Sequence, residues 1–77
     1  MKASEIERLT QRLGQRSEGE FHYPELYGLD WDRLSIGARV RYGREFLEAV
    51  RKGVFPGVED TGRKKGGGRL YIWTGEE

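Results

Sequence analysis

Residues 35–53 read SIGARVRYGREFLEAVRKG, and this stretch decides how the rest of the chain is interpreted. Five of its residues recur at intervals of four, three, four and three, which is the spacing of one face of an α-helix. They are Ile36, Val40, Gly43, Leu47 and Val50. Ser35 is suited to cap such a helix and Gly53 to end it. We therefore expect a long helix from about residue 36 to residue 52 that buries this stripe, with another element packed close to Gly43.

Shorter elements flank the long helix on both sides. Before it, aliphatic residues recur at helical spacing, and a brief aromatic run precedes Pro24, which favours an extended backbone. After it, residues 70–73 alternate with the two-residue period of a strand, and a glycine-rich connection suits a hairpin turn. The predicted elements are an amphipathic helix over residues 3–14, a short strand over 21–23, a helix-turn-helix-like region over 30–53 and a β-hairpin over 57–73. This order predicts a small α+β domain of winged helix-turn-helix type, in which the hairpin is the wing and residues 1–77 form a single domain.

The composition is that of a folded domain with a highly charged surface. Hydrophobic and charged residues each make up 35% of the 77 residues, and the net charge is only +1, so the charge does not force disorder. The charge is nevertheless unevenly distributed. Residues 1–32 carry four Lys or Arg against seven Asp or Glu, a net −3, whereas residues 33–77 carry ten against six, a net +4. A one-sided basic footprint suits a polyanion, although a solvated surface whose charges segregate without a ligand would give the same pattern.

The residues that common catalytic and metal sites require are missing. The sequence has no cysteine, and its single histidine, His22, stands between aromatic residues, where a lone histidine is usually structural. Ser4 and Ser35 are placed to cap helices, and the carboxylates follow no metal-ligand spacing. We therefore expect no enzymatic activity, no cofactor and no metal.

The hydropathy of the chain argues against a membrane protein. No apolar run approaches the length of about 20 residues that spans a bilayer. The first turns of the chain are too charged to hold the apolar region of a signal peptide. The absence of cysteine fits a reducing compartment. These observations predict a cytoplasmic protein with no membrane partner.

The long helix is the first candidate for an interaction surface. Arg41 and Tyr42 lie opposite its apolar stripe. Arg39 and Arg44 lie along the two edges of that stripe. Arginine suits bidentate contacts to phosphate or guanine, so these residues predict a recognition helix in a major groove, with Tyr42 contacting bases.

The same arginines also permit a simpler interpretation. Arg41 stands four residues before Glu45 on the expected helix. Arg44 stands four residues before Glu48. Opposite charges at this spacing form ion pairs on solvated helices, and such pairs would leave few cations free for a ligand. The sequence leaves both interpretations open.

The tip of the predicted hairpin is the second candidate. Three consecutive glycines are surrounded there by basic residues. These are Arg63, Lys64, Lys65 and Arg69. Basic side chains on a flexible loop can contact backbone phosphates without reading the base sequence. The alternative is a solvated turn that lysine keeps soluble.

Residues of the central region follow one spaced pattern. It reads Trp31-x2-Leu34-x2-Gly37-x-Arg39-x3-Gly43-x2-Phe46-x3-Val50-x2-Gly53. This pattern resembles that of a small bacterial and phage domain family, and the similarity runs from about Leu26 to Trp73, with Tyr71 ending a basic hairpin. Tyr42 stands where the family pattern has an aliphatic residue. The resemblance implies a small helical domain with a wing. The family has no settled function, and its members are often labelled by prediction as single-stranded-DNA-binding.

These observations predict a small nucleic-acid-binding protein of phage or bacterial origin, a DNA-binding regulator that binds DNA rather than RNA. The predicted contact residues are Arg39, Arg41, Tyr42, Arg44, Arg63, Lys64, Lys65 and Arg69. The alternative is a phage-type interaction module or inhibitor that docks on a host protein or nucleoprotein complex, since Tyr, Trp and Arg dominate interface hot spots. Assembly into a homodimer through the first helix is also open.

Overall fold

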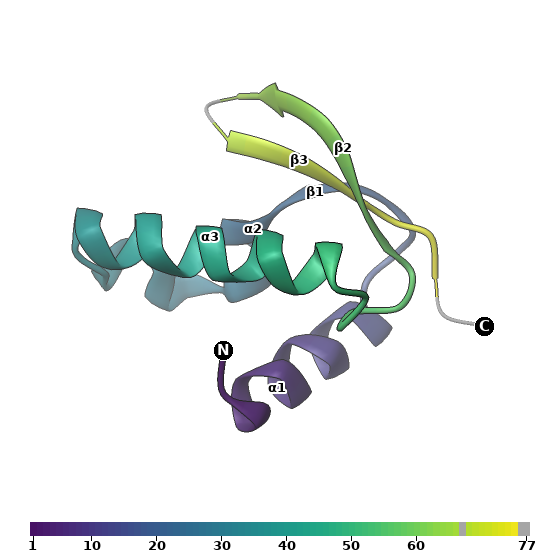
Figure 1. The fold of residues 1–77 in the computed structure, drawn as a ribbon, viewed down its shortest axis with the longest axis horizontal. Coiled ribbons are helices and arrows are strands. Elements are labelled where there is room, and N and C mark those ends of the chain that lie inside the picture. Colours follow the sequence, from purple (N-terminus) through teal and green to yellow (C-terminus); the bar gives the residue numbers. More distant parts are fainter. Residues whose placement is uncertain (67, 76–77) are drawn as a thin grey trace.

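The computed structural model describes residues 1–66 and 68–75 of the chain. Its elements are α1 (Ala3–Gly14), β1 (Gly19–His22), α2 (Tyr23–Tyr27), the 3-10 helix η1 (Leu29–Arg33), α3 (Ile36–Arg51), β2 (Val58–Lys65) and β3 (Gly68–Trp73). The helices lie together on one side of a three-stranded antiparallel sheet (Figure 1). The fold class is therefore α+β, as the sequence predicts.

The last strand of the chain is the middle strand of the sheet. The strand order is β1-β3-β2, so β3 pairs with its hairpin partner on one side and with β1 on the other. In this register Tyr71 lies opposite both Phe21 of β1 and Asp60 of β2. The pairing with β1 joins the two halves of the chain, and the ladder between β2 and β3 is interrupted by a bulge between Asp60 and Lys64.

The core is built around one aromatic ring of α3. Phe46 is fully buried, and its ring centroid lies 4.3 Å from that of Tyr23 in a stacked arrangement. Three more rings surround it at centroid distances of 4.9, 5.2 and 6.4 Å. They belong to Tyr71, Phe55 and Phe21. Leu9 and Leu13 of α1 belong to the same buried cluster, so the N-terminal helix packs on this core.

The long helix forms where the sequence predicts it, but it is rotated by roughly 90° about its axis from the expected orientation. Ile36 and Val40 of the predicted buried stripe are 78% and 57% exposed. Phe46 and Ala49, which lie outside that stripe, are buried instead. An aromatic side chain buries about 150–250 Å², so the aromatic cluster outweighs the aliphatic stripe in setting the rotation.

Two element boundaries also differ from the sequence-based expectation. The first strand begins at Gly19 and ends at His22, because Tyr23 already belongs to α2. The carboxylate of Glu25 accepts a hydrogen bond from the His22 backbone N–H at 2.9 Å, which starts a helix there rather than prolonging the strand. Ser35 caps α3 as predicted and accepts from the backbone N–H of Ala38 at 3.1 Å. Ser4 is no cap, because α1 begins one residue earlier with Lys2 at the N-cap position.

Replacing Phe46 with alanine should lower the free energy of unfolding by about 3–5 kcal/mol, or leave the chain unfolded, because a fully buried ring is lost. Val40→Ala should change it by less than about 0.5 kcal/mol, because Val40 is largely exposed. Urea denaturation followed by circular dichroism measures both variants. Equal losses would show that α3 buries the aliphatic stripe after all.

Candidate functional site

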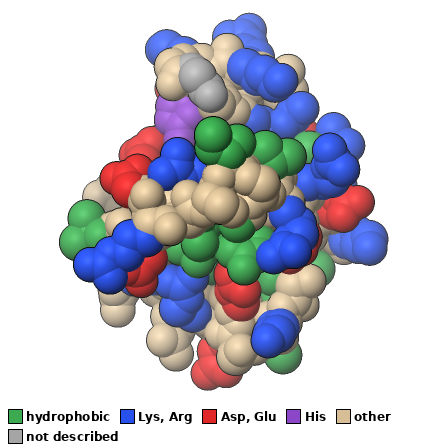
Figure 2. All heavy atoms as spheres, turned by 90° about the vertical axis from the view of Figure 1, so that its left-hand side faces the viewer, with side chains coloured by type: hydrophobic (Ala, Val, Ile, Leu, Met, Phe, Trp, Pro, Cys, Tyr) green, Lys and Arg blue, Asp and Glu red, His purple; other side chains and the backbone are tan. Residues whose placement is uncertain are grey.

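A groove of about 850 Å³ runs between α3 and the tip of the β2–β3 hairpin. Its lining on the α3 side is Arg39, Val40, Gly43, Arg44 and Leu47, and on the hairpin side Lys64, Gly66, Gly68, Arg69 and Tyr71. Residues of β1, α2 and η1 close its base. Figure 2 looks at this end of the molecule, with hydrophobic side chains near the centre of the face and basic side chains around them. The groove thus joins the two segments that the sequence singles out.

Glycine residues on both sides keep the groove open. A Cβ atom added at Gly43 would meet nothing within 4 Å, so no element packs closely against this glycine. That result corrects the expectation of a close approach at Gly43. Its position on α3 faces the groove rather than the core, because the helix is rotated toward Phe46. On the opposite side, a Cβ at Gly68 would lie 3.3 Å from the His22 ring, so the hairpin backbone passes close to that ring.

The two walls of the groove carry cations that have no internal partner. Arg44 projects from α3 and Lys64 from the hairpin, and both are exposed. Within residues 1–66 and 68–75, no carboxylate lies within ion-pair distance of either side chain. The two walls therefore present positive charge toward the same space.

The helix does not form the ion pairs that would make it a simple solvated surface. Glu45 lies 3.8 Å from the N-terminal amino group rather than beside Arg41. The Arg41 guanidinium instead lies over the ring of Tyr42, 5.2 Å from its centroid. Arg44 and Glu48 are likewise not paired in the described part of the chain. Arg41 and Arg44 are therefore available to a ligand.

Two of the predicted contact residues have structural roles. Arg39 donates hydrogen bonds to the backbone carbonyls of Trp31 and Asp32, at 3.2 and 2.9 Å, and so fastens η1 to α3. Arg69 donates from Nη1 to both carboxylate oxygens of Asp60, at 2.9 and 3.2 Å. Both arginines line the groove, but part of their hydrogen-bonding capacity is already used.

The remaining predicted residues lie apart from the groove lining. Tyr42 is half-buried, and its ring stacks on that of Tyr27 with centroids 6.3 Å apart. Arg41 accompanies it on the same part of α3. Arg63 and Lys65 are exposed on the hairpin beside Lys64. The structure thus brings Arg39, Arg44, Lys64 and Arg69 together and leaves the other four around them.

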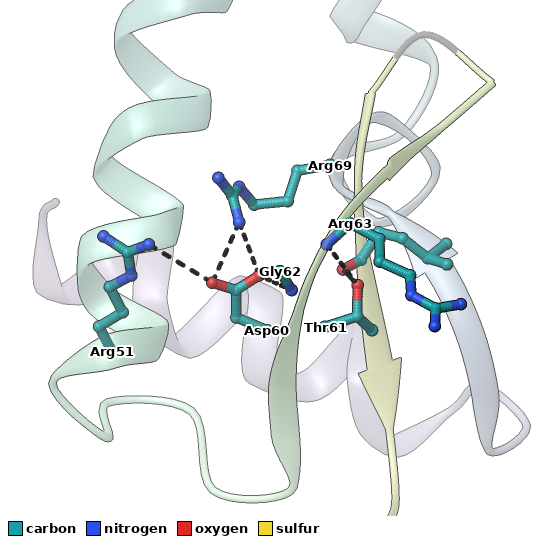
Figure 3. A network of polar contacts seen from close by, with 7 residues as sticks. Arg51, Asp60, Thr61, Gly62, Arg63 and Arg69 are labelled. Atoms are coloured by element: carbon teal, nitrogen blue, oxygen red, sulfur yellow. Dashed lines mark hydrogen bonds and ion pairs between the residues drawn. The ribbon is translucent and has the colours of Figure 1, made fainter.

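Asp60 ties the hairpin to α3 and was not identified from the sequence. Besides Arg69, it accepts from the backbone N–H of Gly62 at 3.0 Å and lies 3.6 Å from Arg51 of α3 (Figure 3). Burial alone would raise the pKa of Asp60, but the Gly62 hydrogen bond and the two guanidinium groups outweigh it and hold the pKa below its ordinary value. The run Asp60-Thr61-Gly62 has the form of an Asx turn, which is the signal that could have revealed it.

His22 holds the tip of the hairpin from the other side. Its Nε2 donates to the backbone carbonyl of Lys65, and its Nδ1 lies 3.1 Å from a carboxylate oxygen of Glu25. The His22 backbone N–H lowers the pKa of Glu25, and the His22 ring and Arg16 lower it further against the opposing effect of burial. The hairpin is therefore fixed at both the bulge and the tip, which sets the width of the groove.

Comparison with known proteins places the chain in a family. The model of a family described as a domain of unknown function, DUF1413, matches residues 6–72, so the chain belongs to this family. This result confirms the expectation of a small family without a settled function. No curated protein and no solved structure matches the chain. None of the helices in the described ranges is long and apolar enough to cross a membrane.

The lowered pKa of Asp60 predicts a defined pH dependence of stability. An unfolded Asp titrates near about 3.9, so Asp60 stabilises the fold above that pH, and this contribution is lost as the pH falls through its lower native pKa. Asp60→Asn should therefore cost about 1–3 kcal/mol at neutral pH and flatten the acid limb of the stability curve. Glu59→Gln is the matched control, because Glu59 is an exposed neighbour on β2. Urea midpoints across the acid range measure the effect, and identical curves for the two variants would refute the role of Asp60.

Proposed function

We propose that this chain is a nucleic-acid-binding domain of winged-helix type, which binds DNA rather than RNA. In this proposal α3 is the recognition helix and the β2–β3 hairpin is the wing. The element order and the strand order β1-β3-β2 support it, because they present a helix and a basic hairpin at the same end of a helical core.

The observation that carries the proposal is the pair of unpartnered cations on the two walls of the groove. Arg44 and Lys64 belong to different elements, face the same space and have no described carboxylate within ion-pair distance. Like charges held together in this way repel each other, and a polyanion relieves that repulsion. Arg63 and Lys65 extend the same charge beyond the groove.

The arginines elsewhere in the chain provide a contrast. Arg8 lies 4.0 Å from Glu5, and Arg16 lies 3.5 Å from Glu25. Arg33 of η1 lies 3.8 Å from Asp30. Arg8, Arg16 and Arg33 therefore have carboxylate partners, whereas Arg44 and Lys64 have none among the described residues. This division is expected of a surface that contacts phosphates on one side only.

The double substitution Lys64→Ala and Lys65→Ala tests the proposal. It should weaken binding about equally for all base sequences and reduce the slope of log K against log salt by about 1.8 on duplex DNA, since each phosphate contact contributes about 0.9. Fluorescence anisotropy with labelled duplex DNA, single-stranded DNA and RNA at about 50 and 200 mM salt measures this.

Lys2→Ala with Lys52→Ala is the matched control. It removes the same charge from exposed positions that do not line the groove. An equal loss of affinity in both double variants would mean that binding depends on the net charge of the chain and not on the lysines of the hairpin. No binding at the lower salt would reject the proposed function and favour the interaction-module alternative.

A further inference from the structure

The groove has an apolar floor between its basic walls. Val40 is 57% exposed, and Leu47 beside it is half-buried. Tyr71 of the central strand lies beneath this floor, because it is only 2% exposed, and burial raises the pKa of its phenol to about 12. Ile36, 78% exposed, continues the α3 stripe beyond the groove. Phosphates gain nothing from such a surface, whereas apolar side chains do.

The length of the groove determines how many residues of an extended ligand it can hold. The stretch of α3 that lines it, residues 39–47, spans about 12 Å along the helix axis. An extended chain covers the same length with about four residues. A duplex, whose major groove alone is about 12 Å wide, would lie across the rim rather than enter.

The charges of the lining indicate the composition of that extended chain. Arg44 and Lys64 stand on opposite walls, and Arg39 and Arg69 add positive charge, whereas Glu25 is the one carboxylate in the described lining. Successive side chains of an extended segment point to opposite sides, so apolar residues can face the floor while acidic residues between them reach the walls.

We propose that the groove binds a short, acidic, extended segment of a partner protein. Its apolar side chains would lie on Val40 and Leu47, and its carboxylates would pair with Arg44 and Lys64. This inference goes beyond nucleic-acid binding and does not depend on it, because it rests on the apolar floor. The two ligands share the basic residues of the walls.

Gly43→Leu provides a selective block of the groove. A Cβ at Gly43 meets no atom within 4 Å, so a leucine side chain can enter the empty floor without displacing the core. Leucine is also a better helix former than glycine, so the variant is expected to fold at least as stably as the parent chain. Gly43→Ala is the matched control, because it makes the same change in helix propensity and adds only a methyl group.

The probe is a synthetic peptide of about seven residues in which glutamate and leucine alternate, added to the ¹⁵N-labelled full chain and followed by NMR. Shifts should appear at the amides of Val40, Gly43, Leu47 and Gly68 in the parent chain. Gly43→Ala should retain this binding, and Gly43→Leu should weaken it by about tenfold or more. A second peptide with serine in place of leucine should bind about tenfold more weakly, because the floor is apolar.

Three results would overturn the inference. The first is no shift with peptide concentrations up to about 1 mM, which corresponds to negligible affinity. The second is equal binding by Gly43→Leu, or equal binding of the serine peptide. The third is equal weakening of peptide binding by Gly43→Ala and Gly43→Leu, since the leucine side chain would then not act by filling the floor. If Lys64→Ala with Lys65→Ala leaves DNA binding unchanged while the parent chain binds the peptide, the proposed function is rejected and this inference stands.

Discussion

The stacking of Phe46 on Tyr23, with ring centroids 4.3 Å apart, decides which face α3 turns toward the core. Once Phe46 is enclosed by the aromatic rings of both sheet and helices, the rotation of α3 is fixed. Val40, Gly43 and Arg44 are then left facing the hairpin. The groove therefore follows from the packing of one aromatic side chain, because the rotation expected from the aliphatic stripe would bury Val40 and Gly43.

The groove also requires that the tip of the β2–β3 hairpin be held apart from α3. Asp60 provides the attachment at the bulge through Arg51 and Arg69, and His22 provides it at the tip through the carbonyl of Lys65. The contact between Asp60 and Arg69 is a charge-assisted hydrogen bond, a type that is shorter and stronger than a neutral one. The side chains of Arg63, Lys64 and Lys65 can therefore remain exposed, since none of them is needed to attach the hairpin.

The helices and strands could be predicted from the sequence, but the rotation of α3 about its axis could not. The extent of α3, the Ser35 cap and the hairpin followed from periodicity and local hydrogen bonding, which act within a few residues. The rotation of α3 did not, because its aliphatic stripe and its aromatic face share the same helical period. The roles of Arg39 and Arg69 depend on partners eight and nine residues away, in other elements or across the hairpin, and a spacing rule does not contain them.

The central claim is that α3 and the hairpin form one binding surface at one end of the molecule. The most direct measurement is the NMR footprint of a short duplex DNA on the ¹⁵N-labelled chain. The account predicts shifts concentrated at the amides of residues 39–44 and 63–69, with α1 unaffected. Shifts centred on α1, or spread evenly over all exposed basic residues, would contradict it.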